Sequence, residues 1–391
     1  MPWNEESPMD LKTQFLSEYL ARTLSFAELC RRYDVSRKTG YKWVSRYECL
    51  GPSGLEDRSR RPSTNPTQTP EAIREAIIAA RRRHPTWGSK KLLKVLHDAD
   101  PSLAWPSRRT ASEILAREGL VRQRVRTRRG AHPGKPTTVA SAPNQIWCVD
   151  FKGHFKTLDG RYCYPLTVTD AFSRFLVCCS GLLSPELAAT KAVFSGLFRR
   201  YGLPGRIKSD NGAPFASTAL GRLSTLSVWW IRLGIRPELI VPGKPYQNGQ
   251  HERMHRTLKE ETALPPAADV RAQQRRFDGF RREFNHIRPH EGIDLEVPAS
   301  RFEASARRLP RVLPAIEYPA HYERRLVSEN GGIRWNSRWV AVSTTCAGEY
   351  IGLEEAFHGV WDVYFGPIKL GRLLEDTLRI EDDRGRTRRH V

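Results

Sequence analysis

The chain has 391 residues, enough for about three domains, and 39% of them are hydrophobic, so folded cores are expected. The formal net charge of +21 at pH 7 indicates a polyanionic partner such as nucleic acid. No apolar run of about 18 residues and no signal peptide occur in the sequence, which argues against a membrane-spanning protein. The cysteines show neither a CxxC pair nor a zinc-type spacing, which argues against disulfide-bonded and zinc-finger classes. Together these features predict a cytoplasmic protein.

Three short helices are predicted at the N-terminus, over residues 11–20, 26–33 and 37–48. Their apolar residues recur at helical spacing, and Ser25 and Ser36 can cap the second and third helices. The tight turn before the last helix favours a helix-turn-helix domain over 1–62, with a plain three-helix bundle as the alternative. Four cations of the third helix are then expected to face DNA: Arg37, Lys38, Lys42 and Arg46.

A second helical unit is predicted after a Pro-, Ser- and Thr-rich linker at 51–70. Its helices are expected over residues 71–83, 89–97 and 108–118. Ser107 can cap the third of them, and Gly119 can end it. We expect a second helix-turn-helix-like domain over 66–126, with Arg108 and Arg109 at the start of its DNA-facing helix.

A basic arm follows, because residues 119–149 contain six Lys or Arg and no acid. Its apolar content is too low for a packed core, so we expect residues 121–136 to be disordered without DNA, with a basic linker at 127–139. A solvated charge run is the alternative interpretation. The arginines expected to contact DNA are Arg122, Arg124, Arg126, Arg128 and Arg129.

An alternation of strands and helices is predicted next, over 140–305. Strands are expected at residues 146–155, 162–170, 175–179, 206–209 and 239–241. Helices are expected at residues 185–201, around 249–259 and at 274–286. This order is typical of an α/β domain.

Three carboxylates lie where elements of this α/β region begin or end. Asp150 lies near the end of an apolar strand, Asp210 follows the strand at 206–209, and Glu252 lies on the first turns of a polar helix. Oxygen ligands suit Mg²⁺ or Mn²⁺, and two such ions about 3.5–4 Å apart can activate a water or a 3′-hydroxyl for phosphodiester chemistry. Asp170, Glu238 and Glu260 remain as rival ligands.

Five motifs of the chain resemble the Asp-Asp-Glu core of the retroviral-integrase superfamily, and most of all bacterial insertion-sequence transposases of the IS3/IS481 type. The motifs lie at residues 147–150, 209–212, 247–253, 256–259 and 286–291. The resemblance implies an RNase H-like core in which Asp150, Asp210 and Glu252 hold two Mg²⁺ or Mn²⁺ ions. The 41 residues between Asp210 and Glu252 exceed the family's usual gap, and we expect the extra residues within 216–230.

Helical spacing places Glu252, His255, Arg256 and Lys259 on one face of their helix, with Met254 and Leu258 facing the core. We expect Arg256 and Lys259 to hold the DNA backbone near the scissile phosphate. An amphipathic surface helix with solvated charges is the alternative.

A β-rich tail ends the chain after a linker at 303–319. Strands are expected at residues 322–327, 333–335, 339–342, 350–353, 360–365 and 369–374. Their spacing suggests a small SH3-like β-barrel over 320–378, and retroviral-type integrases end in similar barrels.

The resulting hypothesis is a Mg²⁺-dependent DDE transposase that binds terminal inverted repeats, cleaves DNA and transfers strands. The expected partners are double-stranded DNA and further copies of the chain, at least a dimer, associated with a bacterial nucleoid. The first alternative is an inactive or repurposed helix-turn-helix repressor. The second alternative is an RNase H or Holliday-junction nuclease on the same fold.

Overall fold

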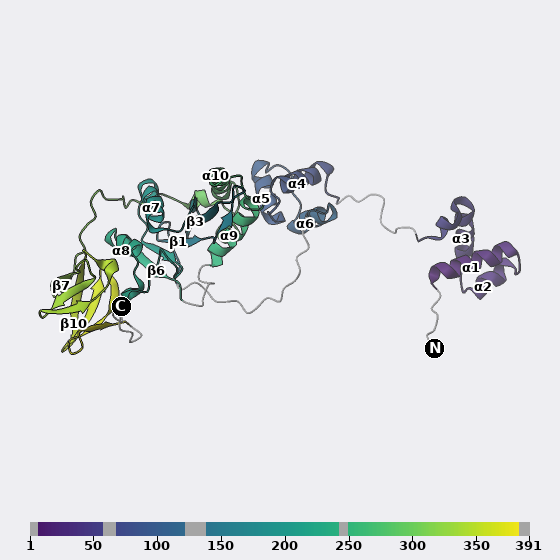
Figure 1. Ribbon diagram of the computed structural model, residues 1–391. Helices are drawn as coiled ribbons and strands as arrows, with labels where there is room; N and C mark the ends of the chain where they lie inside the picture. The colour runs from purple at the N-terminus through teal and green to yellow at the C-terminus, as the bar shows by residue number, and fades with distance from the viewer. Residues whose placement is uncertain (1–6, 58–67, 122–137, 242–248, 383–391) are drawn as a thin grey trace. The chain divides into compact units, whose positions relative to one another are not determined.

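The computed structural model describes residues 7–57, 68–121, 138–241 and 249–382 (Figure 1). The chain divides into two compact units, Met1–Gln68 and Thr69–Val391, and each is described by itself. The five arginines of the basic arm lie outside the described residues. No helix in the described ranges is long and apolar enough to cross a membrane.

The first unit consists of α1 (Pro8–Ala21), α2 (Phe26–Arg32), α3 (Arg37–Leu50) and the 3₁₀ turn η1 (Gly51–Leu55). Ser25 and Ser36 cap α2 and α3 through their side chains, as predicted. Gly40 lies where a Cβ atom would approach Cys30 Sγ and Phe26 Cζ to 2.9 Å, so glycine permits the close approach of α3 and α2. The linker expected from residue 51 begins later, because Leu55 is buried in the helical core.

The second unit opens with α4 (Glu71–Arg83), α5 (Ser89–Ala99) and α6 (Arg108–Arg117). Ser107 Oγ accepts a hydrogen bond from the Thr110 backbone and so caps α6. The three helices surround a core in which Ile77, Trp87 and Leu92 are almost fully buried. Both helical units therefore fold around small apolar cores of their own.

A mixed six-stranded sheet forms the centre of the second unit. Its strands are β1 (Ile146–Phe151), β2 (Phe155–Lys156), β3 (Tyr162–Asp170), β4 (Leu176–Leu182), β5 (Arg206–Ser209) and β6 (Arg236–Leu239). The main path runs β2-β3-β1-β5-β6, with β4 paired to β3. Strand β1 is antiparallel to β3 and parallel to β5, which confirms the RNase H-like order. The strand expected at 146–155 is in fact two strands, and the one expected at 239–241 lies three residues earlier.

Helices cover both faces of this sheet (Figure 1). Helices α7 (Leu187–Tyr201) and α8 (Thr225–Arg232) pack on one face, and α9 (Gly249–Thr262) and α10 (Val270–His286) pack on the other. Successive side chains of a strand point to opposite faces. On β3, Leu166 and Val168 accordingly join the α7–α8 core, while Cys163 joins the α9–α10 core.

The segment between Asp210 and Glu252 in which the extra residues are expected, 216–230, includes η2 (Leu220–Arg222) and most of α8. Trp229 and Trp230 of α8 pack into the core of the central sheet. Val228 and Ile231 of the same helix pack against the C-terminal strands. This segment therefore joins the core to the tail of the chain.

The tail forms a five-stranded antiparallel sheet and a separate hairpin. Its strands are β7 (Glu323–Leu326), β8 (Gly332–Trp335), β9 (Arg338–Ala341), β10 (Tyr350–Phe357), β11 (Val360–Phe365), β12 (Ile368–Leu374) and β13 (Arg379–Glu381). The sheet order is β13-β12-β11-β10-β7, with β8 paired only to β9, so the predicted closed barrel is wrong. Residues of η2 and α8 cover the apolar side of these strands, which therefore need not close on themselves.

Candidate active site

Asp150 projects from the central strand β1 toward the helix α9. Its neighbours Trp147 and Val149 are fully buried in the α7–α8 core, and alternation sends Asp150 to the opposite face. In the β1–β3 ladder Asp150 lies opposite Thr167. The sequence therefore fixes the direction of this carboxylate through the apolar residues on either side of it.

Asp210 follows β5, the parallel neighbour of β1, so both carboxylates lie toward the same edge of the sheet. Its carboxylate accepts a hydrogen bond from the Gly212 backbone at 3.2 Å. The adjacent Asn211 Nδ2 donates to the Ile240 carbonyl at 2.9 Å and ties this turn to the end of β6. Glu252, in the first turn of α9, is exposed.

The three carboxylates interact electrostatically. Burial raises the pKa of Asp150 to about 7, and the negative charges of Asp210 and then of Glu252 add to the rise. Lys152 and the Phe151 backbone act in the opposite direction. Asp210 and Glu252 therefore lie near enough to Asp150 to disfavour its ionised form, which a divalent cation would favour.

Asp150, Asp210 and Glu252 suit a metal ion because of the chemistry of their donor atoms. Carboxylate oxygens are the donors that Mg²⁺ and Mn²⁺ prefer. Within the described residues, no group of three or more His, Cys, Asp or Glu side chains is gathered closely enough to hold an ion. The side chains of Asp150, Asp210 and Glu252 would have to approach one another to complete a coordination shell.

A buried polar network joins α9 to the sheet behind Asp150. Thr167 Oγ1 lies 2.6 Å from Nε2 of both His251 and His255, and 3.1 Å from the Asp150 carbonyl oxygen. Thr169 Oγ1 lies 2.9 Å from Nδ1 of His251. Both imidazoles are at least 96% buried, and burial lowers the pKa of His251 to about 3 and that of His255 to about 2, so both rings are neutral.

One arrangement of protons satisfies this network. The single hydroxyl proton of Thr167 goes to the Asp150 carbonyl, and both imidazoles donate from Nε2 to the Thr167 oxygen. The unprotonated Nδ1 of His255 then faces Asp150 Oδ2 at 3.7 Å. Because His255 is neutral, this contact is not an ion pair.

The sequence interpretation placed His255 on the charged face of α9 with Glu252, and this is wrong, because only 4% of His255 is exposed. A signal was present in the sequence. His251 and His255 lie four residues apart and share the 3–4 residue spacing of Met254 and Leu258, which marks the buried side of the helix.

Two of the rival acids, Asp170 and Glu238, have other partners. Asp170 is 1% exposed and accepts hydrogen bonds from the Asn144 backbone and from the backbone and hydroxyl of Ser173, so it closes the β3–β4 turn. Glu238 lies 3.0 Å from the buried Lys208 Nζ. Glu260 lies two turns beyond Glu252 on α9 and lines a pocket with Arg253 and Arg256.

The described DNA-binding candidates lie on exposed helix surfaces. Arg37, Lys38 and Lys42 of α3 are exposed, and Arg46 is half-buried. Arg108 and Arg109 are exposed at the start of α6, where Arg109 pairs with Glu113 at 3.0 Å. Arg256 and Lys259 are exposed on α9, which also carries Glu252. The structure thus leaves these cations accessible in both helical units and in the core.

Comparison with known families assigns four segments of the chain. Two models of the integrase core domain match residues 140–245 and 233–298. A helix-turn-helix domain matches residues 11–63, and a homeodomain-like domain matches residues 39–115. Residues 140–298 of the chain are therefore similar to the integrase core domain. This confirms the resemblance to the integrase superfamily and to insertion-sequence transposases.

Proteins similar to the chain include ones from insertion elements and from retroviruses. The chain is 28% identical over 270 residues to the IS476 insertion-element 39.2 kDa protein of Xanthomonas euvesicatoria, covering 65% of this chain and 71% of that one. It is 29% identical over 206 residues to the IS407 31.7 kDa protein of Burkholderia multivorans, covering 48% and 66%. The Gag-Pol polyprotein of baboon endogenous virus is 29% identical over 193 residues, 48% of this chain but only 10% of the polyprotein.

Solved structures with a similar core include the HTLV-2 integrase catalytic core domain in complex with magnesium. It is 17% identical, with a TM-score of 0.33, and the match covers 42% of this chain and all but 1% of that one. The simian T-cell lymphotropic virus intasome is 16% identical with a TM-score of 0.37, covering 72% and 98%. An integrase core placed together with helix-turn-helix domains supports a transposase-type function within the polynucleotidyl transferase superfamily.

Proposed function

We propose that the protein is a DDE transposase that binds the terminal inverted repeats of its element, cleaves DNA and transfers the new strand end to a target. The observation that carries the proposal is the match of residues 140–298 to the integrase core domain in a chain that also matches helix-turn-helix domains. The pKa of Asp150, which burial and the charges of Asp210 and Glu252 raise, supports the proposal. A strongly perturbed carboxyl beside two more carboxylates is typical of a catalytic site. The accessible cations on the helical units support DNA binding.

In this proposal Asp150, Asp210 and Glu252 hold two Mg²⁺ or Mn²⁺ ions. Such ions supply an activated water or 3′-hydroxyl and stabilise the leaving oxygen of a phosphodiester. The protein residues have the task of positioning. Thr167, His251 and His255 anchor the first turns of α9, so they hold Glu252 against the edge of the sheet where Asp150 and Asp210 lie.

The DNA would be held along the whole chain. In this proposal the chain consists of a helix-turn-helix domain at 1–62, a second one at 66–126, a basic linker at 127–139, the catalytic core at 140–305 and a C-terminal β domain at 320–378. Arg256 and Lys259 of α9 are placed to hold the backbone near the scissile phosphate. Two element ends must be joined, so the working form is at least a dimer, acting on DNA in a bacterial cytoplasm.

A strand-transfer assay tests the proposal, with the wild type, Asp150→Asn and Glu252→Gln on DNA that carries the element's own ends. We expect joined products only with the wild type and only with Mg²⁺ or Mn²⁺, while all three proteins bind the ends equally. Glu186→Gln, an exposed acid before α7, is the matched control and should keep full activity. Activity in Glu252→Gln would move the third ligand to Glu238 or Glu260.

The alternative function is a DNA-binding repressor without catalysis. One observation favours it, because the carboxylates in the described residues are not gathered into a coordination shell. The same assay separates the two functions. Tight binding of the ends without any metal-dependent product in the wild type would favour the repressor.

A further inference from the structure

A pocket of about 430 Å³ lies beside the candidate active site, between the second helical unit and the core. Its walls come from several elements of the second compact unit and carry five cations. Lys91 comes from α5, Arg174 from the β3–β4 turn, Arg253 and Arg256 from α9, and Arg288 from the segment after α10. Arg174 and Arg253 lie about 80 and 160 residues after Lys91 in the sequence, and yet the three positively charged side chains line the same pocket.

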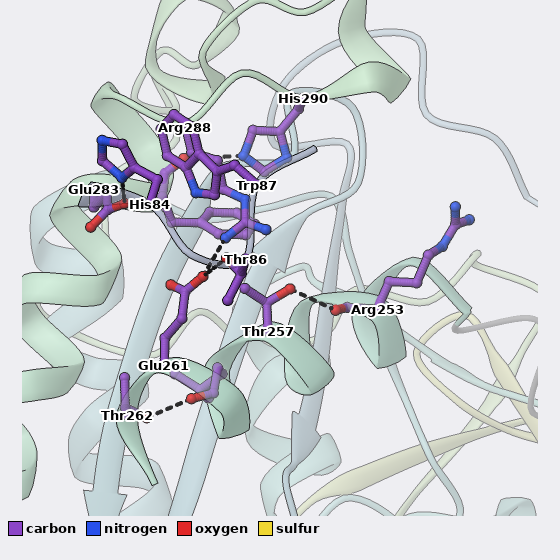
Figure 2. A network of polar contacts seen from close by, with 12 residues as sticks. His84, Thr86, Trp87, Arg253, Thr257, Glu261, Thr262, Glu283, Arg288 and His290 are labelled. Carbon is purple, nitrogen blue, oxygen red and sulfur yellow. Dashed lines mark hydrogen bonds and ion pairs between the residues drawn. The ribbon is translucent and has the colours of Figure 1, made fainter. Parts of the chain in front are cut away.

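Four of these cations have no ion-pair partner in the ranges that the structure describes. Only Arg288 has one, since its Nη1 lies 2.9 Å from Glu261 Oε1 (Figure 2). Arg174 Nη1 is buried and makes no hydrogen bond within the described residues. An unsatisfied buried donor of this kind is unusual in a folded protein and indicates a missing acceptor.

Three acids, Asp170, Glu260 and Glu291, line the pocket against its five cations, so a net positive charge remains. Asp170 accepts three hydrogen bonds from its own turn and from Asn144. Glu291 lies 3.8 Å from Lys90, outside the group of five. Glu260 is exposed and has no ion pair in the described part of the chain. Like charges that are partly withdrawn from water repel one another, and a bound anion would relieve that cost.

We propose that this pocket binds a phosphate group of the DNA backbone, held by Lys91, Arg174 and Arg253. Guanidinium groups bind phosphate oxygens through paired hydrogen bonds, and the lysine adds a point charge. The inference rests on the proposed function, because it takes DNA to be the substrate. It adds a site to which the helical unit and the catalytic core contribute together.

The position of the pocket gives this phosphate a role. Arg253 follows Glu252 directly on α9, so the pocket and the candidate metal ligand share one turn of helix. The same wall includes Thr169, whose hydroxyl contacts His251. Figure 2 shows Arg288 beside Trp87, the buried tryptophan of the helical unit, and Glu261 reaching both Arg288 and Thr86. A phosphate in the pocket would join α5 to the helix that carries Glu252.

The first test measures DNA affinity of the full chain against salt, with a mixed-sequence duplex of about 30 base pairs. Each phosphate contact contributes about 0.9 to the slope of log K against log salt concentration. Lys91→Gln and Arg253→Gln should each lower the slope by about 0.9. If both residues hold the same phosphate, the double variant loses about 0.9 as well, and not about 1.8. Arg199→Gln, an exposed cation of α7, is the matched control and should keep the wild-type slope.

A second test locates the phosphate. Uncharged methylphosphonate groups are placed one at a time along the strand of an element end. At one position the substitution should weaken binding by the wild type several-fold and leave binding by Lys91→Gln unchanged. Additive slope losses in the double variant, or no such position along the strand, would overturn the proposal.

The outcomes separate this inference from the proposed function. Strand transfer with unchanged salt slopes in the variants would overturn the pocket alone. Non-additive slopes in a protein that makes no metal-dependent product would overturn the transposase and support the pocket. Stoichiometric binding of inorganic phosphate by the wild type, with no effect of Lys91→Gln on DNA binding, would assign the pocket to a free anion and overturn the DNA proposal. Thermal melting checks that each variant is folded. Arg253 is exposed, so we expect Arg253→Gln to fold like the wild type.

Discussion

Thr167 Oγ1 of β3 lies 2.6 Å from Nε2 of His255 on α9. The contact joins the strand opposite Asp150 to the helix that carries Glu252. It is fully buried, so its polar atoms have no access to water as a substitute partner. The distance between two of the proposed metal ligands therefore depends on a hydroxyl group that contacts no metal.

Replacing Thr167 with valine tests this dependence. The change keeps the shape of the side chain but leaves two buried imidazole nitrogens without a partner, each at a cost of about 1–3 kcal/mol. We expect a lower melting temperature and a loss of strand transfer of at least about tenfold, with DNA affinity unchanged.

The matched control for this variant is Thr190→Val on α7. Thr190 is also fully buried, and its hydroxyl has no hydrogen-bond partner in the described structure. Removing an unsatisfied hydroxyl should leave both stability and activity unchanged or slightly improved. Equal effects of the two substitutions would mean that the Thr167 network has no special role in placing α9.

DNA binding should weaken above pH 8 because of Lys91. Burial lowers the pKa of Lys91 to about 8; Arg288 lowers it further, while Glu291 and Glu261 oppose the shift. A bound phosphate favours the charged amine, so above pH 8 binding requires uptake of a proton. The affinity should fall by up to about tenfold per pH unit above pH 8, measured by fluorescence anisotropy at constant ionic strength.

Lys91→Gln should lose this pH dependence, and Lys90→Gln should keep it. Lys90 is the sequence neighbour, 43% exposed at its side chain, and pairs with Glu291 at 3.8 Å. A wild-type affinity that is constant from pH 7 to 9.5 would contradict a role for the Lys91 charge in holding DNA.

Glu261→Gln should loosen the contact between the second helical unit and the core. Arg288 is only 7% exposed, so loss of the Glu261 charge leaves a largely buried guanidinium without its ion-pair partner. We expect a cost of between about 1 and 3 kcal/mol, below that of a fully buried pair because Glu261 is partly accessible to water.

The readout is faster hydrogen–deuterium exchange at residues 84–92 together with a lower melting temperature. Glu113→Gln breaks the exposed Arg109 pair of α6 and should change stability by less than about 1 kcal/mol. If the two variants behave alike, the Glu261–Arg288 contact does not hold the helical unit against the core.

Alkylation of the native protein should modify Cys49 and spare the other cysteines. Cys49 is exposed, whereas the others are half-buried or buried. Burial raises the pKa of Cys163 and Cys346 to about 11 and that of Cys178 to about 12, which suppresses the reactive thiolate. Iodoacetamide at pH 8 followed by mass spectrometry should find one modified site, and rapid modification of Cys178 would contradict the burial described.

Local chemistry let the sequence predict most elements of the fold. The caps of α2, α3 and α6 come from Ser25, Ser36 and Ser107, and each satisfies backbone donors within three residues. Strand β3 was predicted with the bounds observed, because its apolar and polar residues are bounded by turns. Such signals depend on neighbouring residues alone, so a single sequence contains them.

Contacts between distant residues were decided by the tertiary structure. The C-terminal strands were predicted as a closed barrel, but Leu220 and Ile231 from a segment about 100 residues earlier cover their apolar side, so they form open sheets. His255 looked like a surface residue, and its burial depends on Thr167, 88 residues away. Hydrophobic burial is non-directional. A pattern of apolar residues in the sequence therefore shows that one face of an element is covered, but it does not show which other segment covers it.

By itself, the sequence determined the order of the elements, the three acidic positions at strand and helix ends, and the cationic helices that indicate DNA. Only the tertiary structure decided which side of α9 faces the sheet, what covers the C-terminal strands and which cations meet beside Glu252. Lys91, Arg174 and Arg253 come from three elements and share no sequence pattern. Their proximity follows from the packing of α5, the β3–β4 turn and α9, which local sequence does not specify.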